Sequence, residues 1–159
     1  MNTPDAYFHA ERAGGMVFVL LGVVAIGVAV WSWRYGAFWR GAAWPLVLVA
    51  LLQIGVGASV WWRSPQDLAR VRQLVVSERL RVDSEEIPRV QQVVREFARN
   101  RWIEFALIAV GLLMAALAPR GTFWQGIAVG LVLQVGLVCF VDWFGERRAA
   151  AYLAWLQLP

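Results

Sequence analysis

The chain has few residues suited to thiol or imidazole chemistry, because it contains one cysteine, Cys139, and one histidine, His9. A single cysteine excludes an intrachain disulfide and paired-thiol redox chemistry. A single histidine leaves no Cys/His zinc framework and no bis-histidine haem site. Lysine is absent as well, so all 15 basic residues are arginine. The sequence therefore predicts no metal, no cofactor and no thiol or haem enzyme.

The composition points to a membrane protein. Hydrophobic residues make up 60% of the 159 residues, and the mean hydropathy is +0.56. In a soluble protein, the net charge of +4 and the pI near 10.2 would suggest nucleic-acid binding. Here the arginines lie beside apolar stretches, as the rules of membrane insertion require. We therefore expect no nucleic-acid partner.

Four stretches are long and apolar enough to cross a bilayer, which takes about 20 residues in a helix. They cover residues 14–33, 42–62, 102–118 and 122–142. The first is too long for the core of a signal peptide and has no small-residue cleavage site, so we expect it to remain in the mature protein. The third and fourth are separated by a very short turn, which predicts an antiparallel hairpin.

The distribution of arginines predicts the orientation. Most arginines lie before the first stretch, between the second and third, or after the fourth, whereas Arg34, Arg40 and Arg120 lie on the other side. By the positive-inside rule, both termini face the cytoplasm. The predicted fold is all-α: a polytopic protein of the bacterial inner membrane with a four-helix bundle and a cytoplasmic, amphipathic helical hairpin between helices 2 and 3.

That hairpin occupies residues 63–101. Ser64 and Pro65 predict a helix start, followed by a helix to Arg81, a break at 82–84 and a second helix that runs into the third span. Residues 146–158 predict a C-terminal helix that either continues the fourth span or lies in the interface. The apolar stripes of the hairpin either pack together at the membrane surface, with arginines on anionic headgroups, or form a groove for a protein partner.

Ionisable residues gather where the four spans meet the cytoplasm, and such residues at membrane depth are candidates for function. They are His9, Glu11, Arg12, Arg63, Arg101, Glu104, Asp142, Glu146, Arg147 and Arg148. Glu104 lies deepest among the glutamates, and we expect it to pair with an arginine such as Arg12 or Arg147. The cluster either clamps the helix ends or includes a proton-accepting or ligand-binding carboxylate. A metal site from His9, Glu11, Glu104 and Glu146 has no supporting spacing motif.

Two glutamines, Gln53 and Gln134, lie near the middle of the second and fourth spans, and each is the expected hydrogen-bond partner of the other. The sequence Phe-Trp-Arg-Gly at 38–41 also resembles Phe-Trp-Gln-Gly at 123–126, a faint internal repeat that chance could also produce. Close helix packing is predicted where small residues stand four apart. These pairs are Gly126 with Gly130, Gly55 with Ser59, and Gly111 with Ala115.

No cluster of residues in the chain identifies a reaction. The leading hypothesis is a non-enzymatic membrane protein that acts through protein contacts of the hairpin and span surfaces, such as an accessory subunit or an immunity-type protein. One alternative is a small transporter or channel, active as a homo-oligomer, with Glu104 as its coupling carboxylate. A second alternative is a lipid-modifying enzyme at the cytoplasmic interface.

Overall fold

The computed structural model describes residues 4–77 and 82–158, and within them the fold is all-α. Its elements are α1 (Pro4–Ser32), α2 (Ala37–Ser77), a π-helical turn η1 (Val82–Glu86), α4 (Ile87–Leu117) and α5 (Phe123–Leu156). By length and composition, the described part holds four helices able to cross a membrane. The expected set of four membrane-span-like helices is therefore confirmed.

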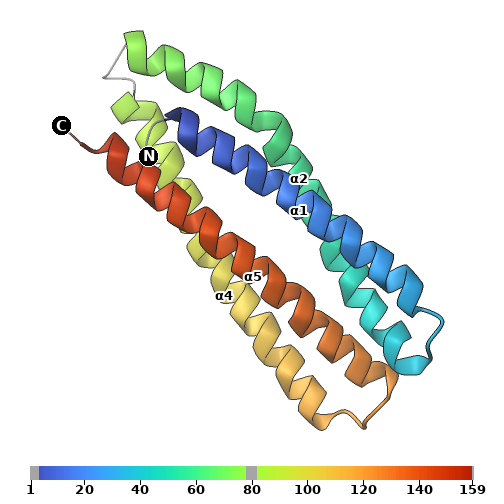
Figure 1. The fold of residues 1–159 in the computed structure, drawn as a ribbon. Helices are drawn as coiled ribbons and strands as arrows, with labels where there is room; N and C mark the ends of the chain where they lie inside the picture. Colours follow the sequence, from blue (N-terminus) through green and yellow to red (C-terminus); the bar gives the residue numbers. More distant parts are fainter. Residues whose placement is uncertain (1–3, 78–81, 159) are drawn as a thin grey trace.

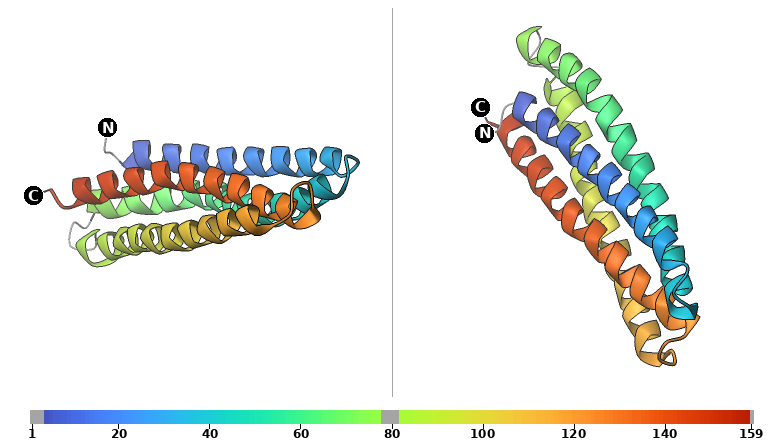
Figure 2. Two further views of the ribbon diagram at one scale, coloured as in Figure 1. Left: turned by 90° about the horizontal axis from the view of Figure 1, so that it is seen from below. Right: turned by 45° about the vertical axis from the view of Figure 1, so that its right-hand side comes forward.

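The four helices form two antiparallel hairpins, α1 with α2 and α4 with α5, as Figure 1 shows. The short turns of both hairpins lie at one end of the bundle, and both chain termini lie at the other (Figures 1 and 2). Each turn contains a glycine with positive φ, Gly36 at 107° and Gly121 at 75°, a conformation that other residues rarely adopt. We call these ends the turn end and the terminal end.

The helices continue further than the sequence pattern predicted. Ser64 does not cap a new helix, because α2 runs without interruption from Ala37 to Ser77. The Ser64 hydroxyl instead donates to the carbonyl oxygen of Val60 within the same helix, at 2.8 Å. The expected break at 82–84 falls within the π-helical turn, and the predicted helix end at Arg81 lies outside the described residues. At the C-terminus, α5 extends to Leu156 as one helix.

At the turn end, the backbones of α2 and α5 touch. A Cβ atom placed on Gly41 would overlap the carbonyl oxygen of Phe123, and one placed on Gly126 would overlap that of Phe38. Gly130 lies against Ala42 in the same way. The small-residue prediction is therefore confirmed for Gly126 and Gly130.

The other two small-residue pairs differ from each other. Gly111 on α4 is in contact with α5, since a Cβ atom there would lie 2.6 Å from the Val132 side chain. Gly55 on α2 has no neighbouring atom within 4 Å of such a Cβ position. The prediction of close packing is thus correct at Gly111 and wrong at Gly55, which borders a cavity described below.

The α2–α5 contacts are reciprocal, as a two-fold axis between these helices would require. The offset that takes Phe38 to Phe123 also takes Gly41 to Gly126 and one positive-φ glycine, Gly36, to the other, Gly121. It also pairs positions buried in both halves, Ser64 with Ala149 and Val71 with Leu156. The two hairpins are therefore pseudo-equivalent in sequence register and at the α2–α5 contact.

The best-packed side chains lie at the terminal end, where all four helices contribute to one core cluster. Its buried members are Tyr7, Phe8, Val71, Leu74, Val90, Ala149, Tyr152 and Leu156. The Tyr7 and Tyr152 rings stack with centroids 4.3 Å apart. The apolar stripes predicted for residues 63–101 therefore pack together and against α1 and α5.

A buried carboxylate closes this cluster. Glu86 is fully buried and accepts two hydrogen bonds from the Arg89 guanidinium, at 2.9 and 2.6 Å. The Tyr152 hydroxyl donates to the same carboxylate at 3.3 Å, and Arg70 lies 3.5 Å away. Such a network ties α2, α4 and α5 together, because a buried charge is tolerated only when it is paired and hydrogen-bonded.

Candidate functional site

Between the turn-end contact and the terminal core, the hairpins separate around a cavity of about 740 Å³. All four helices line it, and it extends from the glutamine level of the spans to the terminal end. Most lining groups are apolar, including Phe18, Val56, Val60, Val138 and Val141. The polar and charged lining side chains are Tyr7, Glu11, Gln53, Ser59, Arg63, Glu96, Asn100, Glu104, Asp142 and Arg148.

Gln53 lies near the middle of its span, further from the terminal end than the charged lining side chains, and it contacts Gln134 of α5. Gln134 Nε2 donates a hydrogen bond to Gln53 Oε1, so the pairing expected from the sequence is present. Gln53 lines the cavity and is only 2% exposed, yet its own Nε2 has no hydrogen-bond partner.

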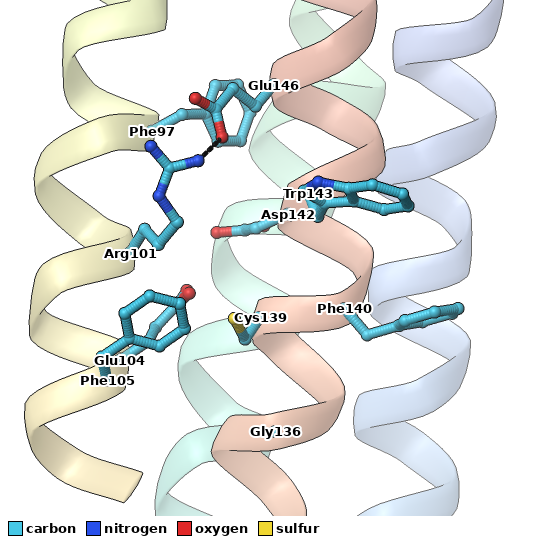
Figure 3. A pocket seen from close by; sticks show the side chains of 10 residues that line it. All are labelled: Phe97, Arg101, Glu104, Phe105, Gly136, Cys139, Phe140, Asp142, Trp143 and Glu146. Atoms are coloured by element: carbon cyan, nitrogen blue, oxygen red, sulfur yellow. Dashed lines mark hydrogen bonds and ion pairs between the residues drawn. The ribbon is translucent and has the colours of Figure 1, made fainter. Parts of the chain in front are cut away.

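Glu104 and Asp142 face each other across the interface of α4 and α5. Cys139 of α5 lies on the same side of this interface. The three residues also line a second cavity, of about 350 Å³, on this interface (Figure 3). Glu104 is buried, with 7% of its surface exposed, whereas Asp142 is half-buried.

The expected pairing of Glu104 with Arg12 or Arg147 is not formed. The Arg12 guanidinium lies over the Trp61 ring, and the Arg147 guanidinium lies over the Trp143 ring, 4.3 Å from its centroid. This prediction was wrong because a guanidinium near an exposed indole is stabilised by the ring and stays near water.

The arginine nearest to Glu104 along α4 is also engaged elsewhere. Arg101 forms an ion pair with Glu146 of α5 at the mouth of the α4–α5 cavity (Figure 3). Both residues were predicted members of the charged cluster, and the structure brings them together. Their ion pair links the two helices and leaves the Glu104 and Asp142 carboxyl groups facing each other.

The remaining predicted residues lie apart from this centre. His9 is exposed on α1, and Glu11 accepts a hydrogen bond from Ser64 of α2 at 3.3 Å. Across residues 4–77 and 82–158, no three His, Cys, Asp or Glu side chains come close enough to hold a metal ion. His9, Glu11, Glu104 and Glu146 therefore do not form the metal site considered from the sequence.

Sequence reasoning missed the buried Glu86 and did not place Arg63 and Arg148 in a cavity. Glu86 was read as an acidic residue in a first helical turn, since only tertiary packing shows that it is enclosed. The two arginines could have been found by extending the faint repeat. The offset between its halves takes Glu11 to Glu96 and Arg63 to Arg148, and all four residues line the central cavity.

The chain was also compared with known proteins. No protein-family model, no curated protein and no solved structure matches it.

Proposed function

We propose that this chain is a multi-pass protein of a bacterial inner membrane that binds a small amphipathic molecule in its central cavity. Arginine placement supports an orientation with the terminal end in the cytoplasm, where exposed guanidinium groups would meet anionic headgroups. The cavity would then reach from the cytoplasmic side to the middle of the membrane.

The observation that carries this proposal is the chemical character of the cavity. Its volume of about 740 Å³ lies within the usual range for small-molecule pockets. Apolar side chains and glycines supply most of the wall, and the polar and charged side chains among them would fix the orientation of the ligand. Polar side chains at membrane depth are candidates for function, and Glu104, Asp142 and Gln53 all line this cavity.

The test uses photoreactive decyl probes with three headgroups: an alcohol, a phosphate and a trimethylammonium. We expect at least one probe to label cavity-lining residues of α2 and α5 in phosphatidylcholine nanodiscs, as mapped by mass spectrometry. Val141→Trp would fill the cavity and suppress this labelling, whereas Leu133→Trp, on an exposed and non-lining position, would not. Labelling of lipid-facing positions alone, unaffected by Val141→Trp, would contradict the proposal.

Proton-coupled transport is a second candidate, and the placement of Glu104 and Asp142 on one cavity favours it. Carboxyl groups at membrane depth are candidates for carrying protons, and these two line the same cavity between α4 and α5. In reconstituted vesicles, Glu104→Gln would then abolish probe uptake driven by a pH gradient. Glu146→Gln, which removes the ion pair with Arg101, is the matched control and would leave uptake largely intact. Uptake unaffected by Glu104→Gln would eliminate this candidate.

A protein partner at residues 63–101 is another candidate, favoured by the polar face that this region presents. Its apolar stripes are buried in the terminal core, so a partner would bind the exposed side, where Arg70 and Arg72 lie. Replacing both arginines by glutamine would then prevent co-purification of the partner. Retention of a co-purifying protein by that double variant would contradict this candidate.

A further inference from the structure

We infer that the central cavity selects an elongated amphipathic anion, whose phosphate or carboxylate is bound by Arg148 and whose chain carries an oxygen that accepts a hydrogen bond from Gln53. This inference rests on the proposed function and specifies the ligand class for the same cavity. It follows from a comparison of the two pseudo-equivalent hairpins, residue by residue, along the cavity wall.

In the first hairpin, the charged lining groups are satisfied within the protein. Arg63 Nε lies 3.1 Å from the carboxylate of Asp67, one helical turn further along α2. Glu11 accepts a hydrogen bond from the Ser64 hydroxyl. Arg63 is therefore paired within its own helix, and Glu11, as a carboxylate, would not bind an anionic headgroup.

In the second hairpin, the position equivalent to Asp67 holds no carboxylate that could pair with Arg148. The offset that takes Arg63 to Arg148 takes Asp67 to Tyr152, whose hydroxyl donates to Glu86 in the core. Among the described residues, no carboxylate forms an ion pair with Arg148. Its guanidinium lies over the cavity wall at Gly14, where a Cβ atom would be 2.8 Å from one of its nitrogens.

The acidic residues that line the cavity are engaged with other groups. Glu96 accepts a hydrogen bond from Gln92 at 2.9 Å, and Glu104 and Asp142 face each other. Arg148 is therefore the charged group of the wall that is most available to a ligand. A guanidinium binds phosphate or carboxylate with two parallel hydrogen bonds, which favours an anionic headgroup.

A second and independent feature points to the other end of the ligand. Gln53 lines the cavity, its buried Nε2 has no hydrogen-bond partner, and an unsatisfied buried donor is destabilising. Arg148 lies 14 residues beyond Gln134, the hydrogen-bond partner of Gln53, which is about 21 Å along α5 at about 1.5 Å per residue. An inorganic anion could not reach both groups. An anion with an apolar chain and a distal oxygen would reach both, and its chain would lie against Val56, Val60 and Val138.

The experiment measures displacement of the photoreactive phosphate probe by unlabelled competitors in phosphatidylcholine nanodiscs. The competitors are decyl phosphate, ω-hydroxydecyl phosphate, ω-hydroxydecanoate, decanol, decyltrimethylammonium and inorganic phosphate. We expect the two ω-hydroxy anions to compete best. The ratio of the concentrations at which they displace the probe shows whether the cavity prefers a phosphate or a carboxylate headgroup. Inorganic phosphate is expected not to compete.

Arg148→Gln is expected to weaken competition by the anions about tenfold, as loss of a charge-assisted hydrogen bond would. Arg63→Gln removes the pseudo-equivalent arginine, which Asp67 already pairs, and is expected to weaken competition less than Arg148→Gln does. Arg148→Lys should retain most of the binding, and an unchanged unfolding temperature shows that the variants are folded. Gln53→Leu should abolish the preference for ω-hydroxydecyl phosphate over decyl phosphate, which is expected to be about threefold.

Equal weakening by Arg63→Gln and Arg148→Gln would overturn the inference, because it would show attraction by overall charge. Preferential competition by decanol or decyltrimethylammonium would also overturn it, while leaving the proposed cavity binding in place. If no probe labels the cavity of the unmodified protein, the proposed function itself fails. The outcomes therefore separate the two proposals.

Discussion

The two ends of the bundle are built differently from the same pair of helices. At the turn end, glycines allow the backbones of α2 and α5 to touch, and a Cβ atom at Gly41 or Gly126 would overlap the opposite chain. Towards the terminal end, the same helices border a cavity of about 740 Å³ before the core formed around Phe8 and Tyr152. The difference indicates that the bundle is held at both ends and open between them, which suits a binding site.

The largest effect is expected at the terminal core. Phe8→Ala should lower the free energy of unfolding by about 4 kcal/mol, because Phe8 is 1% exposed and its removal leaves a cavity in the core cluster. The matched control is Phe140→Ala, whose side chain is 60% exposed and whose loss should cost about 0.5 kcal/mol or less. Denaturation in mixed detergent micelles measures both. Equal losses would show that the terminal core does not hold the bundle together.

The buried carboxylate of that core should have the next largest effect. Glu86→Gln removes the charge that Arg89 and Tyr152 contact and leaves a guanidinium poorly paired, which should cost about 3 kcal/mol. Glu146→Gln breaks an ion pair in which Arg101 is more exposed, and should cost about 1 kcal/mol or less. Thermal unfolding measures the stability of both variants. A larger loss of stability in Glu146→Gln than in Glu86→Gln would contradict this prediction.

The turn end should respond to a single methyl group. Gly126→Ala should destabilise the protein by about 2 kcal/mol, because the new Cβ atom forces the α2 and α5 backbones apart. Gly41→Ala should have a similar effect, since the two glycines are pseudo-equivalent. Gly27→Ala meets no atom within 4 Å and should be neutral or stabilising, because alanine favours helix. A large difference between Gly41→Ala and Gly126→Ala would argue against the two-fold relationship.

The smallest effect is expected between the two ends. Gln53→Leu removes one interhelical hydrogen bond, which should cost about 0.6 kcal/mol. It also removes the unpartnered Nε2, so the net loss of stability should be smaller than that of Gly126→Ala. Thermal unfolding of the two variants side by side provides the measurement. A loss above that of Gly126→Ala would place the glutamine pair among the main supports of the fold.

Several features of the fold followed from local patterns. Long uncharged apolar stretches predict helices that can span a membrane, and the helices were found where those stretches lie. The amphipathic spacing in residues 87–97 predicted a helix that merges with the third span, and α4 is continuous from Ile87 to Leu117. The predicted start of a new helix at Ser64 was wrong. A capping residue and a proline mark a helix start only where the preceding helix has ended, and α2 continues through both positions.

The candidate site could be predicted only in part. Gln53 and Gln134 were expected to bond because amides at membrane depth need partners, and they do. The partner of Glu104 could not be predicted, since charge alone does not tell which helix faces which. The helices pack so that Asp142 faces Glu104 and the two guanidinium groups of Arg12 and Arg147 lie on tryptophans.

By itself, the sequence determined that the chain forms long apolar helices separated by short turns, because burial of backbone polar groups in an apolar medium leaves few alternatives. Only the tertiary structure decided which polar side chains have a hydrogen-bond or ion-pair partner on another helix. Glu86 has the sequence pattern of an acidic residue in a first helical turn, yet it is fully buried and accepts a hydrogen bond from Tyr152 of α5. That environment depends on how the helices pack, because Tyr152 lies 66 residues further along the chain.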